Sequence, residues 1–302
     1  MTGHGTTART TEPAPRYERP PERAHSGLPV DIIPSADRDE AISRSALSPG
    51  GKALAGALLR TSRPRIFPGG GLGIEYGALL KTATRPDLLA LHIAEAVAHL
   101  HAAHVDLLFV PGMSGYPIGA MYSQAAAIPA LLLKKQPWST SVATDNAPGS
   151  FVIPSYTGDG DTLISADPTA AADILAAIID RQLAAHVGSS HLKLEVRIAG
   201  ADEIIDKAVM ATAITETAPV FCRSVIVDLL ERRRAQIGAR QVTVDVTVAA
   251  WVTPLLKGYN RAAEHLHSRC GITPFAGVTI SHLQIDPPAI GIQGVGPLAC
   301  ED

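Results

Sequence analysis

The hydrophobic positions of this chain fall into short apolar runs separated by segments with helical periodicity. Residues 105–110 (VDLLFV) and 130–135 (ALLLKK) are apolar with little alternation, which is typical of strands buried on both faces of a parallel sheet. Between residues 86 and 103 the apolar positions recur three or four residues apart, which predicts an amphipathic helix. The order helix, strand, turn, helix, strand is that of βαβ units, so we expect a parallel sheet with right-handed crossovers.

The same pattern continues toward the C-terminus. Residues 151–165 (FVIPSYTGDGDTLIS) predict a hairpin around a Thr-Gly-Asp-Gly-Asp turn. Residues 168–238 read as mainly helical, with one strand, LKLEVRIAG, between two helical pieces. The runs at 242–248 and 275–282 resume the sheet, and we expect them to be adjacent to the two earlier strands.

Composition and charge limit the class of protein. Of 302 residues, 46% are hydrophobic and 18% charged, which suits a soluble globular chain. A net charge of −3 and a pI near 6.4 provide no general attraction for nucleic acid or an anionic membrane. The three cysteines, Cys222, Cys270 and Cys300, are far apart, so neither a disulfide framework nor a zinc site is indicated.

The N-terminal segment gives the expected domain boundary. Residues 1–50 begin with a stretch rich in proline and charge and lack the apolar core of a secretory signal. We therefore expect a flexible arm over 1–50 and one domain over 51–302. The longest apolar window, residues 88–110, carries Glu95, Asp106 and several histidines, so no membrane span is expected and a cytoplasmic location fits best.

Residues 110–120 (VPGMSGYPIGA) carry the first candidate site. They place a glycine turn between a buried strand and a helix, where backbone N–H groups and the helix dipole favour an anion. We expect the amides of Ser114, Gly115 and Tyr116 to hold it. A nucleophilic serine is not indicated, because Tyr116 stands where the hydrolase motif requires glycine.

Two other constellations favour ordinary structural roles. His92, Glu95 and His99 share one side of the predicted helix, which admits a metal site but is more often a polar flank. Asp159 and Asp161 have the spacing that opens a calcium loop, yet the later ligand positions are missing. A solvated turn is the favoured interpretation there.

Four segments in order resemble a known family. The segments are FPGGGLGIEYGALLK, VDLLFVPGMSGYPIGAMYSQAAAIPALLLKK, SFVIPSYTGDGDTLISAD and VTVDVTVAAWVT. Taken together, they are similar to the type I phosphoribosyltransferases, especially adenine phosphoribosyltransferases. The family pattern runs from a Phe-Pro-x-Pro-Gly loop through Ala-Arg-Gly-Phe-x-x-Gly-Ala, basic residues and a hood hairpin to Val-Asp-Asp and Ala-Thr-Gly-Gly-Thr. The likeness covers about half of the chain and treats residues 168–238 as an insertion between hood and phosphate loop.

The resemblance implies an α/β fold, a mostly parallel twisted sheet flanked by helices with a hood hairpin and a mainly helical insertion. It also assigns site residues. The residues implied for the pyrophosphate are Met113, Ser114, Gly115, Tyr116, Lys134 and Lys135. Those implied for the sugar phosphate are Asp245, Thr247, Ala249, Ala250, Trp251, Val252 and Thr253. The base is assigned to Phe67, Leu72, Ile74 and Glu75, and catalysis to Tyr156, Asp159 and Asp161.

The chain also departs from the family pattern. Ser114 replaces the usual arginine, Val246 the second acid, and Trp251 and Val252 the two glycines; the family's catalytic glutamate would fall near Ser155. Side chains in place of glycine would crowd a phosphate turn. A changed sugar donor would require such changes, and loss of catalysis would allow them.

Three readings therefore stay open. The first is a transferase that moves a phosphorylated sugar from its pyrophosphate, bound with Mg²⁺, to a purine such as adenine, in a protein that is a homodimer. The second keeps this chemistry with a bulkier donor, such as allulose 6-phosphate pyrophosphate in nucleoside-antibiotic biosynthesis. The third is a non-catalytic nucleotide binder or scaffold. Small molecules are the partners in the first two readings, with no nucleic acid and no membrane.

Overall fold

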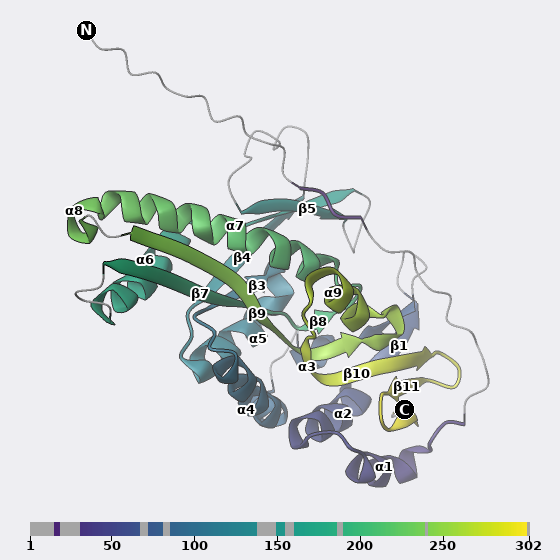
Figure 1. Ribbon diagram of the computed structural model, residues 1–302. Coiled ribbons are helices and arrows are strands. Elements are labelled where there is room, and N and C mark those ends of the chain that lie inside the picture. Colours follow the sequence, from purple (N-terminus) through teal and green to yellow (C-terminus); the bar gives the residue numbers. More distant parts are fainter. Residues whose placement is uncertain are drawn as a thin grey trace.

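The fold is built on one large sheet with a parallel centre. The computed structural model describes residues 15–18, 31–66, 72–80, 85–137, 149–154, 160–185, 190–238 and 241–300. The strand order in the sheet is β12-β11-β10-β9-β7-β3-β4-β6-β5 (Figure 1). Its centre is parallel, and antiparallel strands extend both ends. The α/β class expected from the apolar runs is confirmed.

Five strands form the parallel centre: β4 (Ala130–Pro137), β3 (Leu107–Pro111), β7 (His191–Ala201), β9 (Gln241–Lys257) and β10 (Phe275–Gln284). The four expected strands are therefore in one sheet. They are not all adjacent, however, because β7 lies between β3 and β9.

Hairpins complete the two ends of the sheet. β5 (Ser150–Pro154) and β6 (Asp161–Ser165) form the predicted hairpin, and β6 pairs antiparallel with β4. At the other end, β11 (Ala289–Ile292) and β12 (Gly296–Ala299) follow β10. A separate hairpin joins β1 (Arg63–Ile66) to β2 (Leu72–Glu75), and β8 (Ile204–Ile205) adds a short parallel pairing to β9.

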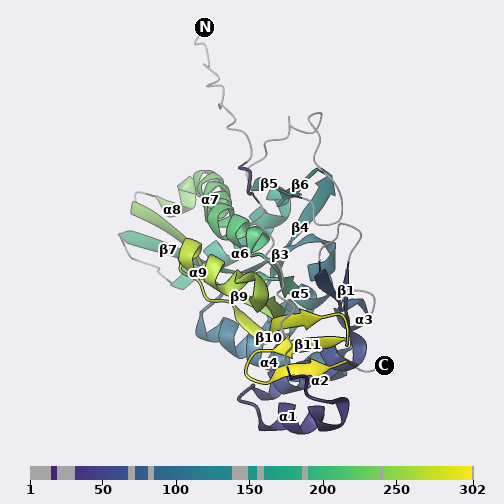
Figure 2. The ribbon, with the colours of Figure 1, turned by 90° about the vertical axis from the view of Figure 1, so that its right-hand side faces the viewer.

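Helices cover both faces of the sheet, as the apolar runs require (Figure 2). Leu108 and Val110 of β3 join one buried cluster, and Leu107 and Phe109 join the other, because successive side chains of a strand point to opposite faces. The first face carries α2 (Pro49–Thr61), α4 (Pro86–Ala102) and α5 (Gly112–Ala126); the second carries α6 (Pro168–Ala185), α7 (Val209–Arg232) and α9 (Ala262–Cys270). Shorter helices are η1 (Ser35–Asp37), α1 (Arg38–Arg44), α3 (Gly77–Leu80), α8 (Arg234–Ile237) and η2 (Gly258–Asn260).

Two expected boundaries are wrong. Residues 168–238 are not a separate insertion, since they supply β7 at the centre of the sheet and the two helices that cover it. The arm expected over residues 1–50 is structured by residue 31, because Ile33 pairs with Leu298 of β12 and Ile42 of α1 is buried. Among the described residues, no helix combines the length and apolar character needed to cross a bilayer.

Candidate active site at the carboxyl ends of the central strands

The turn predicted from VPGMSGYPIGA is the first turn of α5. Helix α5 begins at Gly112, directly after β3, and the φ of Gly112 is +61°, a conformation that favours glycine. In a helix that begins there, the N–H groups of Gly112, Met113 and Ser114 have no carbonyl acceptor in the preceding turn. The first turn of α5 itself contains no acidic residue, and the side chain of its N-cap residue makes no capping hydrogen bond. Such a turn is suited to an anion.

The amides that could contact an anion differ from those predicted. Gly115 and Tyr116 lie far enough into α5 that their N–H groups are expected to bond to the carbonyls of Pro111 and Gly112. Met113 is 75% exposed at the helix start. Met113 and Ser114 are common to the predicted pyrophosphate residues and to the residues whose N–H groups have no helical acceptor.

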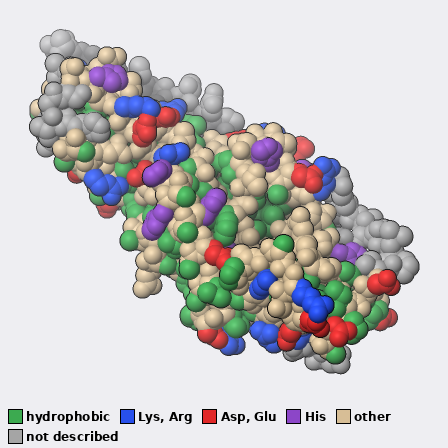
Figure 3. Space-filling model, turned by 60° about the horizontal axis from the view of Figure 1, so that its bottom comes forward, with side chains coloured by type: hydrophobic (Ala, Val, Ile, Leu, Met, Phe, Trp, Pro, Cys, Tyr) green, Lys and Arg blue, Asp and Glu red, His purple; other side chains and the backbone are tan. Residues whose placement is uncertain are grey.

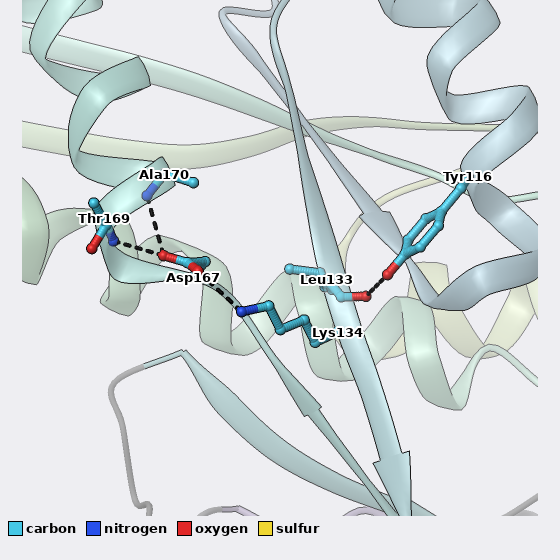
Figure 4. A network of polar contacts seen from close by, with 6 residues as sticks. All are labelled: Tyr116, Leu133, Lys134, Asp167, Thr169 and Ala170. Atoms are coloured by element: carbon cyan, nitrogen blue, oxygen red, sulfur yellow. Dashed lines mark hydrogen bonds and ion pairs between the residues drawn. The ribbon is translucent and has the colours of Figure 1, made fainter.

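Lys135 lies beside this turn. A Cβ atom built on Gly112 would be 3.6 Å from Cδ of Lys135, so the lysine stem passes the start of α5. Tyr116 ties the same helix to β4, because its hydroxyl donates to the carbonyl of Leu133 at 2.5 Å (Figure 4). One cationic side chain is thus held next to the positive end of a helix dipole.

Lys134, predicted to share the pyrophosphate, has another partner. Its Nζ lies 3.0 Å from Oδ2 of Asp167, and the carboxylate also accepts the N–H groups of Thr169 and Ala170 (Figure 4). These hydrogen bonds lower the pKa of Asp167, with Lys134 the largest cause. Lys134 therefore links β4 to the start of α6, and a ligand would have to compete with Asp167 for it.

An acid pair lies beside Gly115, further along α5. Asp202 and Glu203 follow β7 directly, and a Cβ atom on Gly115 would be 2.8 Å from Oδ1 of Asp202 and 3.5 Å from Oε2 of Glu203. Glycine at position 115 is what allows this close approach. The parallel neighbours β3 and β7 thus bring the first turn of α5 and two carboxylates together at their carboxyl ends.

Tyr76 fixes the second acid of the pair. Its hydroxyl donates to Oε1 of Glu203 at 3.2 Å, and both side chains are buried, at 6% and 4% exposure. Burial, followed by the nearby carboxylates of Glu203 and Asp202, raises the pKa of Tyr76 above its ordinary value. The phenol therefore stays protonated and remains a donor to Glu203.

A short turn connects the acid pair to α7. Asp206 in this turn contacts Nζ of Lys257 at 2.9 Å and accepts a hydrogen bond from Asn260. Lys207 is buried, and Ala208 has a φ of +60° immediately before α7 begins at Val209. The order strand, two acids, turn, helix is the one that the resemblance assigned to residues 245–253.

At residues 245–253 the structure contradicts that assignment. They lie within β9, a continuous strand from Gln241 to Lys257, with a bulge that leaves Ala249 without a partner on β7. Asp245 and Thr247 are exposed on the polar face of the strand, while Ala250, Val252 and Thr253 are buried. No phosphate loop exists there.

Trp251 is part of the core. Its exposure is 0%, its indole Nε1 donates to Oγ1 of Thr215 at 2.9 Å, and it lies beside Gly200 of β7. A Cβ atom on Gly200 would be 2.3 Å from the indole ring. Trp251 therefore fills space between β7, β9 and α7 and does not shape a donor pocket.

The residues predicted for the base lie mostly in structural positions. Ile74 is 2% exposed in the core, and Leu72 packs against the same cluster. Glu75 forms an ion pair with Arg65 at 3.4 Å and accepts the N–H of Gly77 at the start of α3. Phe67 lies outside the described residues.

The hood hairpin is present, but its predicted catalytic residues are only partly described. Tyr156 and Asp159 lie outside the described residues. Asp161 opens β6, and its carboxylate is 3.7 Å from Arg16. The pair connects the hairpin to the N-terminal segment 15–18.

The histidine constellation of α4 is structural. His92, expected on a polar flank, is fully buried, and its Nε2 lies 2.5 Å from the hydroxyl of Tyr122. Glu95 accepts hydrogen bonds from Ser48 and the N–H of Gly50, and His99 stacks on Phe275. Each of these groups is held by a protein neighbour, which argues against a shared metal ion.

The sequence contained a signal for the residues that the prediction missed. Asp202 and Glu203 come directly after the strand LKLEVRIAG and shortly before a helical segment. Acids at the carboxyl end of a parallel strand lie where α/β proteins bind ligands. Treating residues 168–238 as an insertion hides this signal. On the face shown in Figure 3, acidic and basic side chains are mixed.

Comparisons with known proteins find adenine phosphoribosyltransferases among solved structures. The enzyme from Giardia lamblia, complexed with 9-deazaadenine, has a TM-score of 0.44 and 14% identity over 77% of this chain and 98% of its own. The chain is similar to these proteins. The enzyme from Trypanosoma brucei, in complex with AMP, pyrophosphate and ribose-5-phosphate, has a TM-score of 0.44 and 12% identity over 78% of this chain and 81% of its own.

A third neighbour, from Saccharomyces cerevisiae, has a TM-score of 0.41 and 14% identity, covering 74% of this chain and 98% of its own. Searches of protein-family models and of curated proteins give no match for the sequence. Likeness at this level does not establish a shared activity. What the site can do chemically follows from its own residues.

Proposed function

We propose that the protein is a glycosyltransferase of the phosphoribosyltransferase type, which moves a phosphorylated sugar from its pyrophosphate to a purine base such as adenine. One observation carries the proposal. The first turn of α5, Lys135 and the acid pair Asp202 and Glu203 meet at the carboxyl ends of parallel strands. A sugar pyrophosphate needs such a combination, an anion site next to acceptors for hydroxyl groups.

Each part of the site has a role in this chemistry. The N–H groups that open α5 and the ammonium of Lys135 bind the pyrophosphate and stabilise its charge as the bond to the anomeric carbon breaks. Asp202 and Glu203 accept hydrogen bonds from the sugar hydroxyls, and Tyr76 holds Glu203 in place. A ring nitrogen of the purine forms the new bond to the same carbon, and the imidazole-ring proton of the purine passes to the departing pyrophosphate. The β5–β6 hairpin limits access of water.

Magnesium fits this site as a companion of the donor. Within the described part of the chain, no three His, Cys, Asp or Glu side chains are grouped to hold a metal ion. Mg²⁺ keeps several waters and is usually bound by substrate phosphates with one or two carboxylates. Asp202, the more accessible acid of the pair, would supply that carboxylate. When bound, the ion neutralises charge on the pyrophosphate.

The turn before α7 supports a donor other than the ribose one. Lys207 and Ala208 of this turn are buried, as is Val209 at the start of α7, and none of the three is glycine. A turn filled by side chains offers fewer amides to a sugar phosphate than a glycine turn does. The second reading, with a ketohexose donor such as allulose 6-phosphate pyrophosphate, therefore becomes the more specific form of the proposal. The same filled turn is the observation that favours the alternative, a nucleotide binder without catalysis.

Turnover with a panel of donors tests the proposal. The full chain is incubated with adenine, Mg²⁺ and, in turn, the pyrophosphates of ribose 5-phosphate and allulose 6-phosphate, and pyrophosphate release is followed. Release with either donor that depends on adenine supports the transferase, and preference for the allulose donor supports the more specific form. Binding of a donor by calorimetry without any release would instead favour the non-catalytic reading.

A further inference from the structure

The first half of β9 is an open edge of the sheet. β7 and β8 pair with one side of β9, and β10 pairs with the other side only from Val252 to Lys257. Among the residues that the structure describes, no strand pairs with residues 241–251 on the side away from β7. In Figure 1, β7 and β9 run together beyond the end of β3. An unpaired row of backbone N–H and C=O groups is a template for another strand.

The comparable edge of β7 is closed by side chains. Gln182 of α6 accepts the N–H of Glu195 at 3.0 Å and donates to its carbonyl. Asp106 accepts the N–H of Arg197 at 3.0 Å, and its own N–H donates to the carbonyl of Arg197 at 2.7 Å. These contacts occupy the backbone groups of β7 where β3 no longer reaches.

The outermost strands are also covered. Arg16 pairs with Val152 at the β5 edge, and Ile33 pairs with Leu298 at the β12 edge. Short extended segments from the N-terminal part of the chain therefore bond to both edges. Within the large sheet, residues 241–251 of β9 form the longest run of described strand residues that has no such partner on one side.

Side-chain burial indicates that a partner would complete this edge. On the face that packs against α7, Leu192, Leu194 and Val196 of β7 are at most 1% exposed. Their counterparts on β9 include Val242 and Val244, which are only half-buried. This difference between neighbouring strands on one face is the one expected if no described segment covers the outer side of β9.

We propose that this edge pairs with the same edge of a second copy of the chain, antiparallel about a two-fold axis. Directly opposite residues of an antiparallel pair have side chains on one face. Pairing centred on Val244 or on Val246 places valine against valine on the α7 face. On the polar face, Asp245 then lies opposite Thr243 or Thr247, whose hydroxyls can donate to its carboxylate.

The sequence of the edge favours a second copy over an unrelated strand. Its residues QVTVDVTV alternate β-branched apolar and polar side chains, so each copy supplies what the other needs on both faces. Asp245 is its only charged residue, and both registers keep the two copies of Asp245 out of direct opposition. A continuous sheet through two subunits would follow.

Acids at the two threonines test this pairing. In the double variant Thr243→Asp and Thr247→Asp, a new carboxylate faces Asp245 of the other copy in either register. Within one chain, Thr243 and Thr247 pair with Lys193 and Arg197, so the new acids have cationic neighbours and the subunit should fold. The matched control, Thr243→Asn and Thr247→Asn, has the same shape without the charge.

Sedimentation velocity of the full chains over a wide concentration range gives the outcome. The unaltered protein and the asparagine variant should form dimers, and the aspartate variant should dissociate at roughly tenfold higher concentration or remain monomeric. A monomeric unaltered protein at every concentration would overturn the proposal, since the edge would then be open or kept for another protein. A dimer that the acids leave unchanged would overturn it too.

Discussion

Replacing Trp251 should destabilise the fold and leave donor preference unchanged. The indole is fully buried between β7, β9 and α7, and its N–H donates to Thr215. Trp251→Ala should lower the free energy of unfolding by about 3–5 kcal/mol, the usual cost of removing a buried aromatic side chain. Trp251→Phe keeps a ring and should lose mainly the hydrogen bond, about 0.5–1.5 kcal/mol.

Gly200 provides an internal check on this argument. A Cβ atom there would be 2.3 Å from the indole, so Gly200→Ala should be strongly destabilising in the presence of the tryptophan. With Trp251→Ala the obstacle is gone, and adding Gly200→Ala should cost little more. The effects of the two changes should therefore be non-additive by about 1–3 kcal/mol.

Urea denaturation followed by circular dichroism measures the unaltered protein, the three single variants and the double variant, with stability taken from the midpoint and slope. The reasoning fails if Trp251→Ala costs less than about 1 kcal/mol, or if the Gly200 and Trp251 effects simply add. A changed donor preference in a stable Trp251→Ala protein would return this residue to the binding pocket.

Two further predictions concern the pH dependence of stability and the affinity for the donor. Burial lowers the pKa of His92 to about 4, so the unfolded chain binds the extra proton first as pH falls. The contribution of His92 to stability should be full above pH 6.5 and decline toward pH 4, by about 3 kcal/mol in all. His92→Gln should flatten this part of a curve of stability against pH measured by urea denaturation. Gly115→Val should push a side chain into Asp202 and weaken donor binding in calorimetry, whereas unchanged affinity would mean that the approach of α5 to the acid pair has no role in binding.

Much of the fold could be predicted because buried parallel strands leave a simple trace in sequence. β3 is an apolar run whose side chains are buried on both faces of the sheet, and α4 shows helical spacing. β4 was expected to be buried in the same way, but only Leu131 and Leu133, on one face, are buried in it, and Leu132 is exposed. The hairpin of β5 and β6 followed from its turn residues. Such patterns depend on the burial and turn preferences of neighbouring residues, which can be read directly from a single sequence.

The strand order could not be read in the same way. Exposed and buried side chains alternate along the first seven residues of β7, because this half of the strand extends beyond β3 and one of its faces is open. That pattern did not distinguish a central strand from a strand within an insertion. Pairing between strands far apart in sequence depends on tertiary contacts, which composition and periodicity do not contain.

The site shows the same division. The turn at Gly112 was found because strand, glycine and helix are consecutive in the sequence. The acid pair was assigned to Asp245 instead of Asp202, since small residues at 249 and 250 resembled a loop although they continue β9. Which acid reaches α5 is decided by the neighbours of β3 in the sheet.

Comparison of these two acids tests the central claim most directly. With the donor that the unaltered protein uses best, the measurement is the rate of adenine-dependent pyrophosphate release by Asp202→Asn and by Asp245→Asn. The account predicts that Asp202→Asn lowers kcat/KM roughly ten- to a hundredfold, the scale of a lost hydrogen bond to a charged group, and that Asp245→Asn has no effect. Loss of activity in Asp245→Asn with full activity in Asp202→Asn would contradict it.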